Sequence, residues 1–349
     1  MRIGLVRRGY SPAGGAESYL RGFAKAAVQA GHETVLFASP EWQDWSFGRK
    51  IVVEGKSPQA FSEALERIRP HGQCDCLLSL ERVSSCDVYR AGDGVHASWL
   101  ARRALLASPL KRLTFTWNPK HRALLNLEKR AVTGARRIIA NSWLVRNEIE
   151  LHYGREIAAK VSIVHNGIDV ARWAHPAVSR DIWRAQNRIP ASQKVAVFAG
   201  SGWERKGLRY AVDAVSRLPD VLLLVAGKGD PRRFAGPNVK FLGPITDMPS
   251  LLHASDAFIL PTIYDPFSNA CLEALAAGLP VITTQANGFA EIQDRATDGA
   301  AVSAPNDISA LEKAVEFWLA SGARAERQQH AAVFSLERNL QATLSIITS

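Results

Sequence analysis

The sequence is poor in cysteine and methionine and has no apolar run long enough to cross a membrane. Its 349 residues include four cysteines and two methionines. The longest apolar runs, Val221–Ala226 and Ala257–Pro261, have the length of a strand and fall far short of the ~18 residues of a membrane span. The cysteines lack the paired spacing of a zinc site, which favours buried, reduced thiols. The apolar stretch after Met1 is too short for a signal peptide, so we expect a cytoplasmic protein.

What is present is typical of a globular chain with a strong positive charge. Hydrophobic residues make up 47% of the sequence and charged residues 22%, which excludes a disordered protein. The length suits two α/β domains of middling size rather than one. The formal net charge is +10, which indicates an anionic partner. Nucleic acid, a membrane surface and a phosphorylated substrate all remain open.

Short β-branched runs alternate with helical periodicity along the whole chain, which predicts βαβ units and parallel sheets covered by helices on both faces. A polar, proline-containing stretch over 171–193 without a clean period is the expected boundary. The fold class is therefore α/β, with two Rossmann-like domains. Ligands bind such sheets at the carboxyl ends of the strands, so two of them facing each other would form a central cleft. The predicted strands are 3–6, 34–38, 51–53, 76–80, 137–140, 161–165, 194–200, 221–226, 239–242, 257–261, 280–284 and 300–303. The predicted helices are 15–29, 59–68, 124–133, 144–153, 207–218, 269–277 and 308–319.

The strongest motif runs from Tyr264 to Thr284 as strand, loop, short helix, glycine stop and strand. Pro266 keeps Asp265 out of the helix, which begins near Ser268. The amides at that helix start carry a partial positive charge and suit a diphosphate. Asp265 precedes them, where it can accept hydrogen bonds from sugar hydroxyls, and Glu273 lies about 7 Å deeper, where it can accept those of a ribose. The residues predicted to surround the diphosphate at this helix start are Phe267, Ser268, Asn269 and Ala270.

Two cations follow the first predicted strand of the second half. In the stretch Gly200–Gly207, Arg205 can grip phosphate with its forked guanidinium and Lys206 supplies a point charge. Taken alone, Arg205 and Lys206 would be interpreted as two solvated side chains of a surface loop. Its place after a strand, together with the carboxylate motif, predicts a site for a nucleoside diphosphate sugar.

These residues resemble a known family. The sequence resembles retaining GT-B glycosyltransferases of family 4 (group 1), and among them the lipopolysaccharide core glucosyltransferases. The resemblance lies in the D-x7-E arrangement of Asp265 and Glu273, the Arg-Lys-Gly after the strand and the stretch Asn166–Asp169. The family has Glu where Asp265 stands, so the resemblance does not determine the identity of the transferred sugar. The resemblance implies an acceptor domain over 1–170, with a C-terminal helix at about 335–349 packed on it, and a donor domain over 171–334.

The resemblance also implies the chemistry. The expected reaction retains the anomeric configuration of a hexose, with UDP-glucose or a similar donor, and the leaving phosphate takes the acceptor proton. Arg205 and Lys206 then stabilise the departing diphosphate. No D-x-D occurs in the chain, which fits a site that needs no metal and no further cofactor.

The first half offers two more candidates. Gly14 and Gly15 follow the first strand, where the backbone can approach a phosphate. A plain βα turn is the alternative, and the family uses a Gly-Gly here to face the donor diphosphate. Asp93 stands between two glycines and is the candidate active-site acid, with a simple turn role as the alternative. His96 is a rival for the same position.

The stretch 97–137 is strongly basic and interleaved with apolar and indole side chains. This pattern suits a phosphorylated glycolipid acceptor and peripheral contact with an anionic inner membrane, and a solvated helix face is the alternative. Two other functions remain possible, a nucleotide-sugar isomerase on the same fold and a basic nucleic-acid-binding protein. The second has no helix-turn-helix, RRM or zinc signature to support it. The basic residues are Arg102, Arg103, Lys111, Arg112, Lys120, Arg122, Lys129, Arg130, Arg136 and Arg137.

Overall fold

A computed structural model describes residues 1–11, 15–42, 45–107 and 118–349 of the chain. It divides into two compact units, one formed by residues 1–165 with 337–349 and the other by residues 166–336. Part of the basic stretch, including Lys111 and Arg112, lies outside the described residues, as does Gly14.

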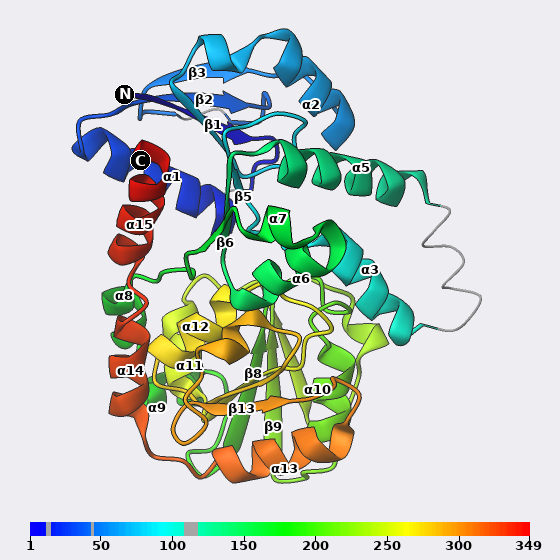
Figure 1. The fold of residues 1–349 in the computed structure, drawn as a ribbon. Helices are drawn as coiled ribbons and strands as arrows, with labels where there is room; N and C mark the ends of the chain where they lie inside the picture. The colour runs from blue at the N-terminus through cyan, green and yellow to red at the C-terminus, as the bar shows by residue number, and fades with distance from the viewer. Residues whose placement is uncertain (12–14, 43–44, 108–117) are drawn as a thin grey trace. The chain divides into compact units, whose positions relative to one another are not determined.

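The first unit is built on a sheet of seven parallel strands in the order β3-β2-β1-β4-β5-β6-β7, with helices packed against it (Figure 1). The interior residues of β1 are fully buried, as expected of a strand covered on both faces. The strands are β1 (Arg2–Arg7), β2 (Glu33–Ala38), β3 (Arg49–Val52), β4 (Cys76–Ser79), β5 (Val88–Arg90), β6 (Arg137–Ala140) and β7 (Val161–Ile163). The helices are α1 (Gly15–Gln29), α2 (Pro58–Arg67), α3 (His96–Leu105), α5 (Pro119–Gly134), α6 (Trp143–Tyr153), α7 (Arg155–Ala158) and α15 (Leu336–Thr348).

The C-terminal helix α15 lies beside α1 in Figure 1. The Tyr19 hydroxyl on α1 is 3.0 Å from the Thr343 hydroxyl on α15. Arg137, at the start of β6, donates to the Ser349 hydroxyl over 2.7 Å. These bonds attach the end of the chain to the first unit.

The second unit is built on six parallel strands in the order β10-β9-β8-β11-β12-β13. The strands are β8 (Lys194–Ala199), β9 (Val221–Ala226), β10 (Val239–Gly243), β11 (Ala257–Leu260), β12 (Val281–Thr284) and β13 (Gly299–Val302). The helices are α8 (Val170–Ala174), α9 (Arg180–Gln186), α10 (Leu208–Val215), α11 (Met248–Ala254), α12 (Asn269–Ala276), α13 (Ile308–Trp318) and α14 (Arg324–Ala332).

Each sheet has a point where the strand order reverses, between β1 and β4 in the first unit and between β8 and β11 in the second. Ligands of doubly wound sheets bind beyond the carboxyl ends of the strands at such a point. In the second unit the loops at this position are those after β8 and after β11, which are the two loops that carry the predicted phosphate and sugar contacts.

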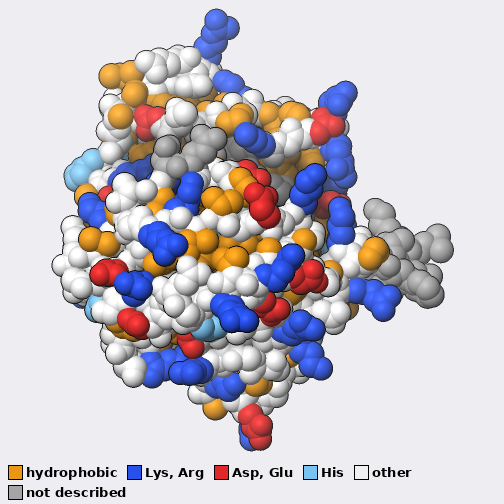
Figure 2. Space-filling model, turned by 90° about the horizontal axis from the view of Figure 1, so that it is seen from above, with side chains coloured by type: hydrophobic (Ala, Val, Ile, Leu, Met, Phe, Trp, Pro, Cys, Tyr) orange, Lys and Arg blue, Asp and Glu red, His pale blue; other side chains and the backbone are white. Residues whose placement is uncertain are grey.

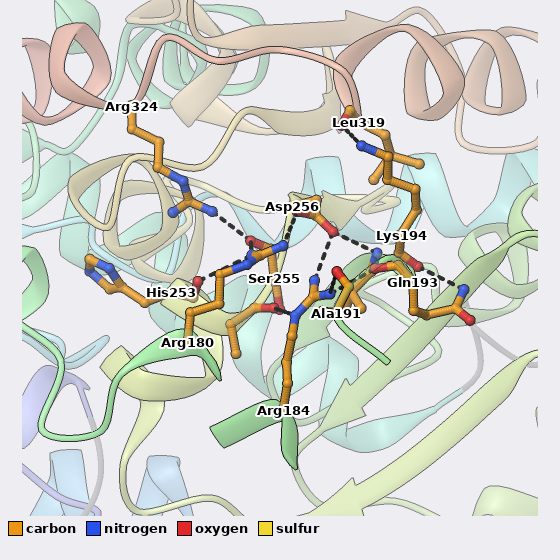
Figure 3. Close-up of polar contacts among 12 residues, drawn as sticks. Arg180, Arg184, Ala191, Gln193, Lys194, His253, Ser255, Asp256, Leu319 and Arg324 are labelled. Atoms are coloured by element: carbon orange, nitrogen blue, oxygen red, sulfur yellow. Dashed lines mark hydrogen bonds and ion pairs between the residues drawn. The ribbon is translucent and has the colours of Figure 1, made fainter. Parts of the chain in front are cut away.

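The segment 171–193, near which the sequence predicts the domain boundary, lies inside the second unit, which begins at residue 166. Helix α9 within it is held by Asp256, which precedes β11 (Figure 3). Arg180 and Arg184 donate to the two Asp256 oxygens over 2.6 and 3.0 Å, and the Val195 amide donates to the same carboxylate over 2.8 Å. Arg184 also donates to the Gln193 carbonyl over 2.8 Å. Side chains far apart in sequence thus fix a segment that shows no period of its own.

Asp256→Asn is expected to lower the free energy of unfolding of the second unit by about 3 kcal/mol, because it leaves the buried Arg184 with less charge compensation. Calorimetric unfolding measures this. Asp230→Asn, which removes an exposed pair with Arg232, is the matched control and should leave the transition unchanged. Asp256 lies at the amino ends of the strands, whereas the predicted nucleotide contacts lie at their carboxyl ends, so nucleotide affinity should stay unchanged. A loss of affinity would contradict this separation of the two ends of the sheet.

Candidate active site

The loops after β8 and β11 are hydrogen-bonded to each other through the main-chain carbonyl of Arg205. The Arg205 carbonyl accepts hydrogen bonds from the Ile263 amide over 2.9 Å and from the Thr262 hydroxyl over 3.0 Å. Gly207 has a φ of +76°, and a Cβ atom there would lie 1.9 Å from the Pro261 carbonyl oxygen. Only glycine permits this approach, which places the cationic loop directly against the loop that carries Asp265.

Two cations lie around one carboxylate at this position. The Arg205 guanidinium donates to the Tyr264 carbonyl over 2.9 Å and lies 3.5 Å from an Asp265 oxygen. The Lys206 ammonium lies 3.8 Å from the same oxygen. Asp265 is buried, with 7% of its surface exposed. Two cations and one carboxylate leave a net charge of +1 at this position. Because the position is partly desolvated, this charge attracts an anion strongly.

The helix that follows begins where the sequence predicts. Ser268 is the N-cap residue of α12, and its hydroxyl accepts from the Cys271 amide over 3.4 Å. The Ser268 amide is itself bonded to the Asn287 side chain over 3.1 Å. Asn287 is 1% exposed and also donates to the Thr283 hydroxyl over 3.0 Å. Its role in holding the start of α12 has no signal in the sequence, because Asn287 follows a different strand.

A second asparagine contacts the start of α12. The Asn166 side chain donates to the Asn269 side-chain oxygen over 2.7 Å and to the Phe267 carbonyl over 3.4 Å. Asn166 belongs to the Asn-Gly-Ile-Asp stretch of the family resemblance. Its neighbour Gly167 has no room for a side chain, since a Cβ there would lie 2.6 Å from the Leu336 Cα. The Asn166 stretch thus fixes the start of α12 through hydrogen bonds to Phe267 and Asn269.

Glu273 on α12 lies in surroundings that disfavour its charge. Burial raises its pKa to about 7, and the nearby cations Lys206 and Arg172 act in the opposite direction. Lys206 therefore acts electrostatically on both acids of the motif. Arg172, on α8, was not among the predicted site residues.

The structure brings one group of predicted residues together in the second unit, and their binding roles remain predictions. Two others, Asp93 and Gly15, belong to the first unit, and Gly14 lies outside the described residues. The group in the second unit consists of Arg205, Lys206, Asp265, Phe267, Ser268, Asn269, Ala270 and Glu273.

Asp93 lies in the loop between β5 and α3, at the carboxyl end of β5. Its side chain is 60% exposed, and an oxygen lies 3.9 Å from the Arg82 guanidinium. His96 begins α3, and its Nε2 is 3.0 Å from Nδ1 of His121. Burial lowers the pKa of His96 to about 4, so this ring is neutral at pH 7. Asp93 is therefore the exposed member of the two candidates and His96 the partly buried one.

Gly200→Ala is expected to weaken binding of a nucleotide sugar several-fold. Gly200 has a φ of +137°, and a Cβ there would lie 2.9 Å from Cδ and Cε of Lys206. The methyl group would displace the ammonium, and the strained backbone would cost about 1–3 kcal/mol of stability. Isothermal titration calorimetry measures the affinity. Gly243→Ala is the matched control, since Gly243 also has a positive φ, +69°, but no atom within 4 Å of its added Cβ. Equal affinity loss in both variants would contradict the displacement of Lys206.

Within the described residues, no helix is long and apolar enough to span a bilayer. The same part of the chain contains no group of three or more His, Cys, Asp and Glu side chains arranged to hold a metal ion. Lys and Arg side chains are spread over the face in Figure 2 and are interspersed with Asp and Glu side chains.

Comparison with known families finds two matches that together span most of the chain. Residues 13–172 match the description Glycosyltransferase Family 4, and residues 193–321 match Glycosyl transferases group 1. A probable transglycosylase of Burkholderia thailandensis is 30% identical over 89% of this chain and 84% of its own length. A glycogen synthase of Mycobacterium tuberculosis is 27% identical over 95% of this chain and 89% of its own. The lipopolysaccharide glucosyltransferase WaaG of Escherichia coli is 24% identical over 85% of this chain and 83% of its own.

Solved structures share the fold. A crystal structure of WaaG, a glycosyltransferase involved in lipopolysaccharide biosynthesis, has a TM-score of 0.82 at 22% identity and covers 99% of this chain and 100% of its own. A structure of Anabaena HepE in complex with UDP and glucose has a TM-score of 0.72 at 19% identity and covers 100% of both chains. The predicted GT-B arrangement of two parallel α/β sheets is confirmed.

Proposed function

We propose, because this chain belongs to the family 4 (group 1) glycosyltransferases, that it transfers a hexose from UDP-glucose or a similar nucleotide sugar, with retention, to a glycolipid acceptor such as a lipopolysaccharide core. The observation that carries the proposal is the gathering of Arg205, Lys206 and Asp265 at the start of α12, with Glu273 on the same helix. The likeness to WaaG supports the acceptor class, and the UDP in the HepE complex supports the donor.

In the proposed donor complex the diphosphate lies at the start of α12. The free amides there and the two cations neutralise it, and no metal is needed. Asp265 accepts hydrogen bonds from the sugar and Glu273 from the ribose. In the free protein both cations face Asp265, so binding of the diphosphate exchanges a single carboxylate for a doubly charged partner.

The chemical step in this proposal breaks the bond between the anomeric carbon and the diphosphate oxygen. The leaving group gains one negative charge, and Arg205 and Lys206 stabilise that charge as it develops. The departing phosphate oxygen takes the proton of the acceptor hydroxyl, so the new glycosidic bond forms on the face that the diphosphate leaves. Asp93 is the proposed acid of the first unit that contacts the sugar or the acceptor.

A thermal-shift screen tests the donor. A ligand present at 100 times its Kd stabilises the folded state by about 2.7 kcal/mol, so a donor raises the unfolding temperature clearly. UDP-glucose, UDP-galactose and GDP-mannose would be compared at equal concentration, because Asp265 is one methylene shorter than the Glu of the family and the sugar is the open variable. A protein indifferent to all of them would contradict the proposal. Release of UDP separates a transferase from an isomerase, which releases none.

We also propose peripheral contact of the first unit with an anionic inner membrane on the cytoplasmic side. Helix α3 carries Arg102 and Arg103 beside Leu105, whose side chain is exposed, and α5 carries Lys120 and Arg122 in its first turn. A bilayer with anionic lipids attracts such a surface by about 1 kcal/mol per basic residue near it. Co-sedimentation with vesicles that contain phosphatidylglycerol, against vesicles of phosphatidylcholine alone, tests this. Equal binding to both would contradict it.

A further inference from the structure

A buried acid on α5 is bonded to the start of α3. Glu128 is 1% exposed and accepts hydrogen bonds from the amides of His96 over 2.6 Å and Ala97 over 3.4 Å. It also accepts from the Tyr153 hydroxyl over 2.7 Å and from Nε of Arg82 over 3.0 Å. All these partners are groups of the first unit, and two of them are the main chain directly after the loop that carries Asp93.

The loop itself is held at two further points. The other end of the Arg82 guanidinium donates to the Gly94 carbonyl over 2.8 Å, and the Asn141 amide donates to the Gly92 carbonyl over 3.2 Å. Arg82 therefore links Glu128 to the peptide that follows Gly94. An Asp93 oxygen lies 3.9 Å from the same guanidinium, and the Asp93 side chain is 60% exposed. The bonds thus fix the backbone on both sides of an acid that is itself open to a ligand.

The position of Glu128 is not explained by packing alone. A helix start usually receives its cap from the residue before it, but Val95 at that position has no polar side-chain atom. Burying a carboxylate is costly unless it is paired and fully hydrogen-bonded, and Glu128 meets both conditions through Arg82, Tyr153 and the two amides. The bonds are strong in this low-dielectric place, so a displaced Glu128 would release the loop.

We propose that Glu128, acting through Arg82 and the 92–97 backbone, is a positioning residue that places Asp93 for the transfer reaction. Glu128 touches no substrate, since its surface is enclosed. The inference rests on the proposed function for the part that concerns transfer. It extends that function to a residue outside the proposed donor site, on α5, whose only earlier proposed role concerns its basic side chains.

Glu128→Gln tests the proposal, because it replaces one carboxylate oxygen by an NH2 group. That group cannot accept hydrogen bonds and would face the amides and side chains that donate to Glu128. With UDP-glucose as the probe and water as the acceptor, we expect kcat to fall about 10–100-fold, the effect of an active group misplaced by about 1 Å. The Kd for UDP-glucose should change far less than kcat, since the proposed contacts of Arg205, Lys206 and Glu273 with the nucleotide lie in the second unit. Glu128→Asp keeps the charge and should recover part of kcat.

Asp87→Asn is the matched control. Asp87 also binds a main-chain amide of the first unit, that of Leu77 over 2.8 Å, but it precedes β5 and makes no contact with the loop. It should lower stability without changing kcat. Equal kcat in Glu128→Gln and wild type, or an equal kcat loss in Asp87→Asn, would overturn the proposal.

Amide hydrogen exchange gives a readout that is independent of activity. In Glu128→Gln, residues 92–97 should exchange at least about tenfold faster, while β5 and β6 keep their protection. If exchange in 92–97 is unchanged, or if the whole unit loses protection, the positioning role is refuted. A wild-type protein that hydrolyses no UDP-glucose while the exchange result holds would instead count against the proposed donor.

Discussion

Lys206→Ala is expected to lower the turnover number for UDP release from UDP-glucose by about 10²–10³-fold, the usual effect of removing one group that stabilises a developing anion. Lys206 lies 3.8 Å from Asp265 and also acts electrostatically on Glu273, so its charge acts on both acids of the proposed donor site. Binding should weaken less than turnover falls, because the leaving diphosphate carries more charge in the transition state than in the bound donor.

The fold should survive this change. Arg205 remains beside Asp265, so the acid keeps a cationic partner. Lys313→Ala is the matched control, since Lys313 is an exposed lysine on α13 of the same unit, and it should leave turnover unchanged. A Lys206→Ala protein with wild-type turnover would refute the phosphate role of this side chain.

Glu273→Gln is expected to weaken UDP-glucose binding about tenfold or more at pH 8, because hydrogen bonds to a charged acceptor contribute about 1.5–3 kcal/mol each. The pKa of Glu273 is raised to about 7 by burial, so the wild-type carboxylate ionises between pH 6 and 8. Wild-type affinity should therefore rise with pH across this range, and the variant should lack the rise. A nucleotide sugar has no terminal phosphate with a second ionisation near pH 6, so the ligand does not contribute.

The same substitution should change the pH dependence of stability. The folded-state pKa of about 7 lies above the ordinary value of 4.5, so between these values the folded protein holds a proton that the unfolded chain has released. Wild-type stability therefore falls as pH rises through this window, by an amount on the order of 1–3 kcal/mol for a side chain that keeps some contact with solvent. Glu273→Gln removes the fall and should be relatively more stable at pH 8 than at pH 5. Glu316→Gln, on the exposed face of α13, is the control, and its free energy of unfolding should depend on pH as that of the wild type does. If the pH dependence of Glu273→Gln also matches the wild type, the raised pKa of Glu273 is contradicted.

Most strands could be predicted because a parallel strand buried on both faces is a continuous apolar run, as in Val221–Ala226. Strand β5 has no counterpart among the predicted elements, since its three residues, Val88–Arg90, are too few for a period and include an arginine. Helix α3 was also missed. Its N-cap residue is Val95, and the acid that binds its first amides, Glu128, lies on another helix. A cap supplied from a distance leaves no local pattern.

The candidate site divides in the same way. Asp265 and Glu273 lie in one continuous motif, and Arg205 and Lys206 lie in another, so local spacing was enough to select them. Asn287 and Arg172 act on that motif from other elements and could be found only by their contacts. The sequence gives no period to 171–193, where it predicts the domain boundary, because the partners that order Arg184 stand about 70 residues further along the chain.

The hydrogen bonds between the loops after β8 and β11 have a consequence for how preference for the proposed donor can change. Arg205 accepts from both Thr262 and Ile263, and Gly207 leaves no space against Pro261, so neither loop can lengthen or slide without opening the other. If Asp265 contacts the sugar as proposed, we expect a chain of this design to acquire a new donor sugar through changes of side chain while the loops stay in place. Position 265 is where such a change would begin, because the resemblance implies a Glu there, one methylene longer than Asp265.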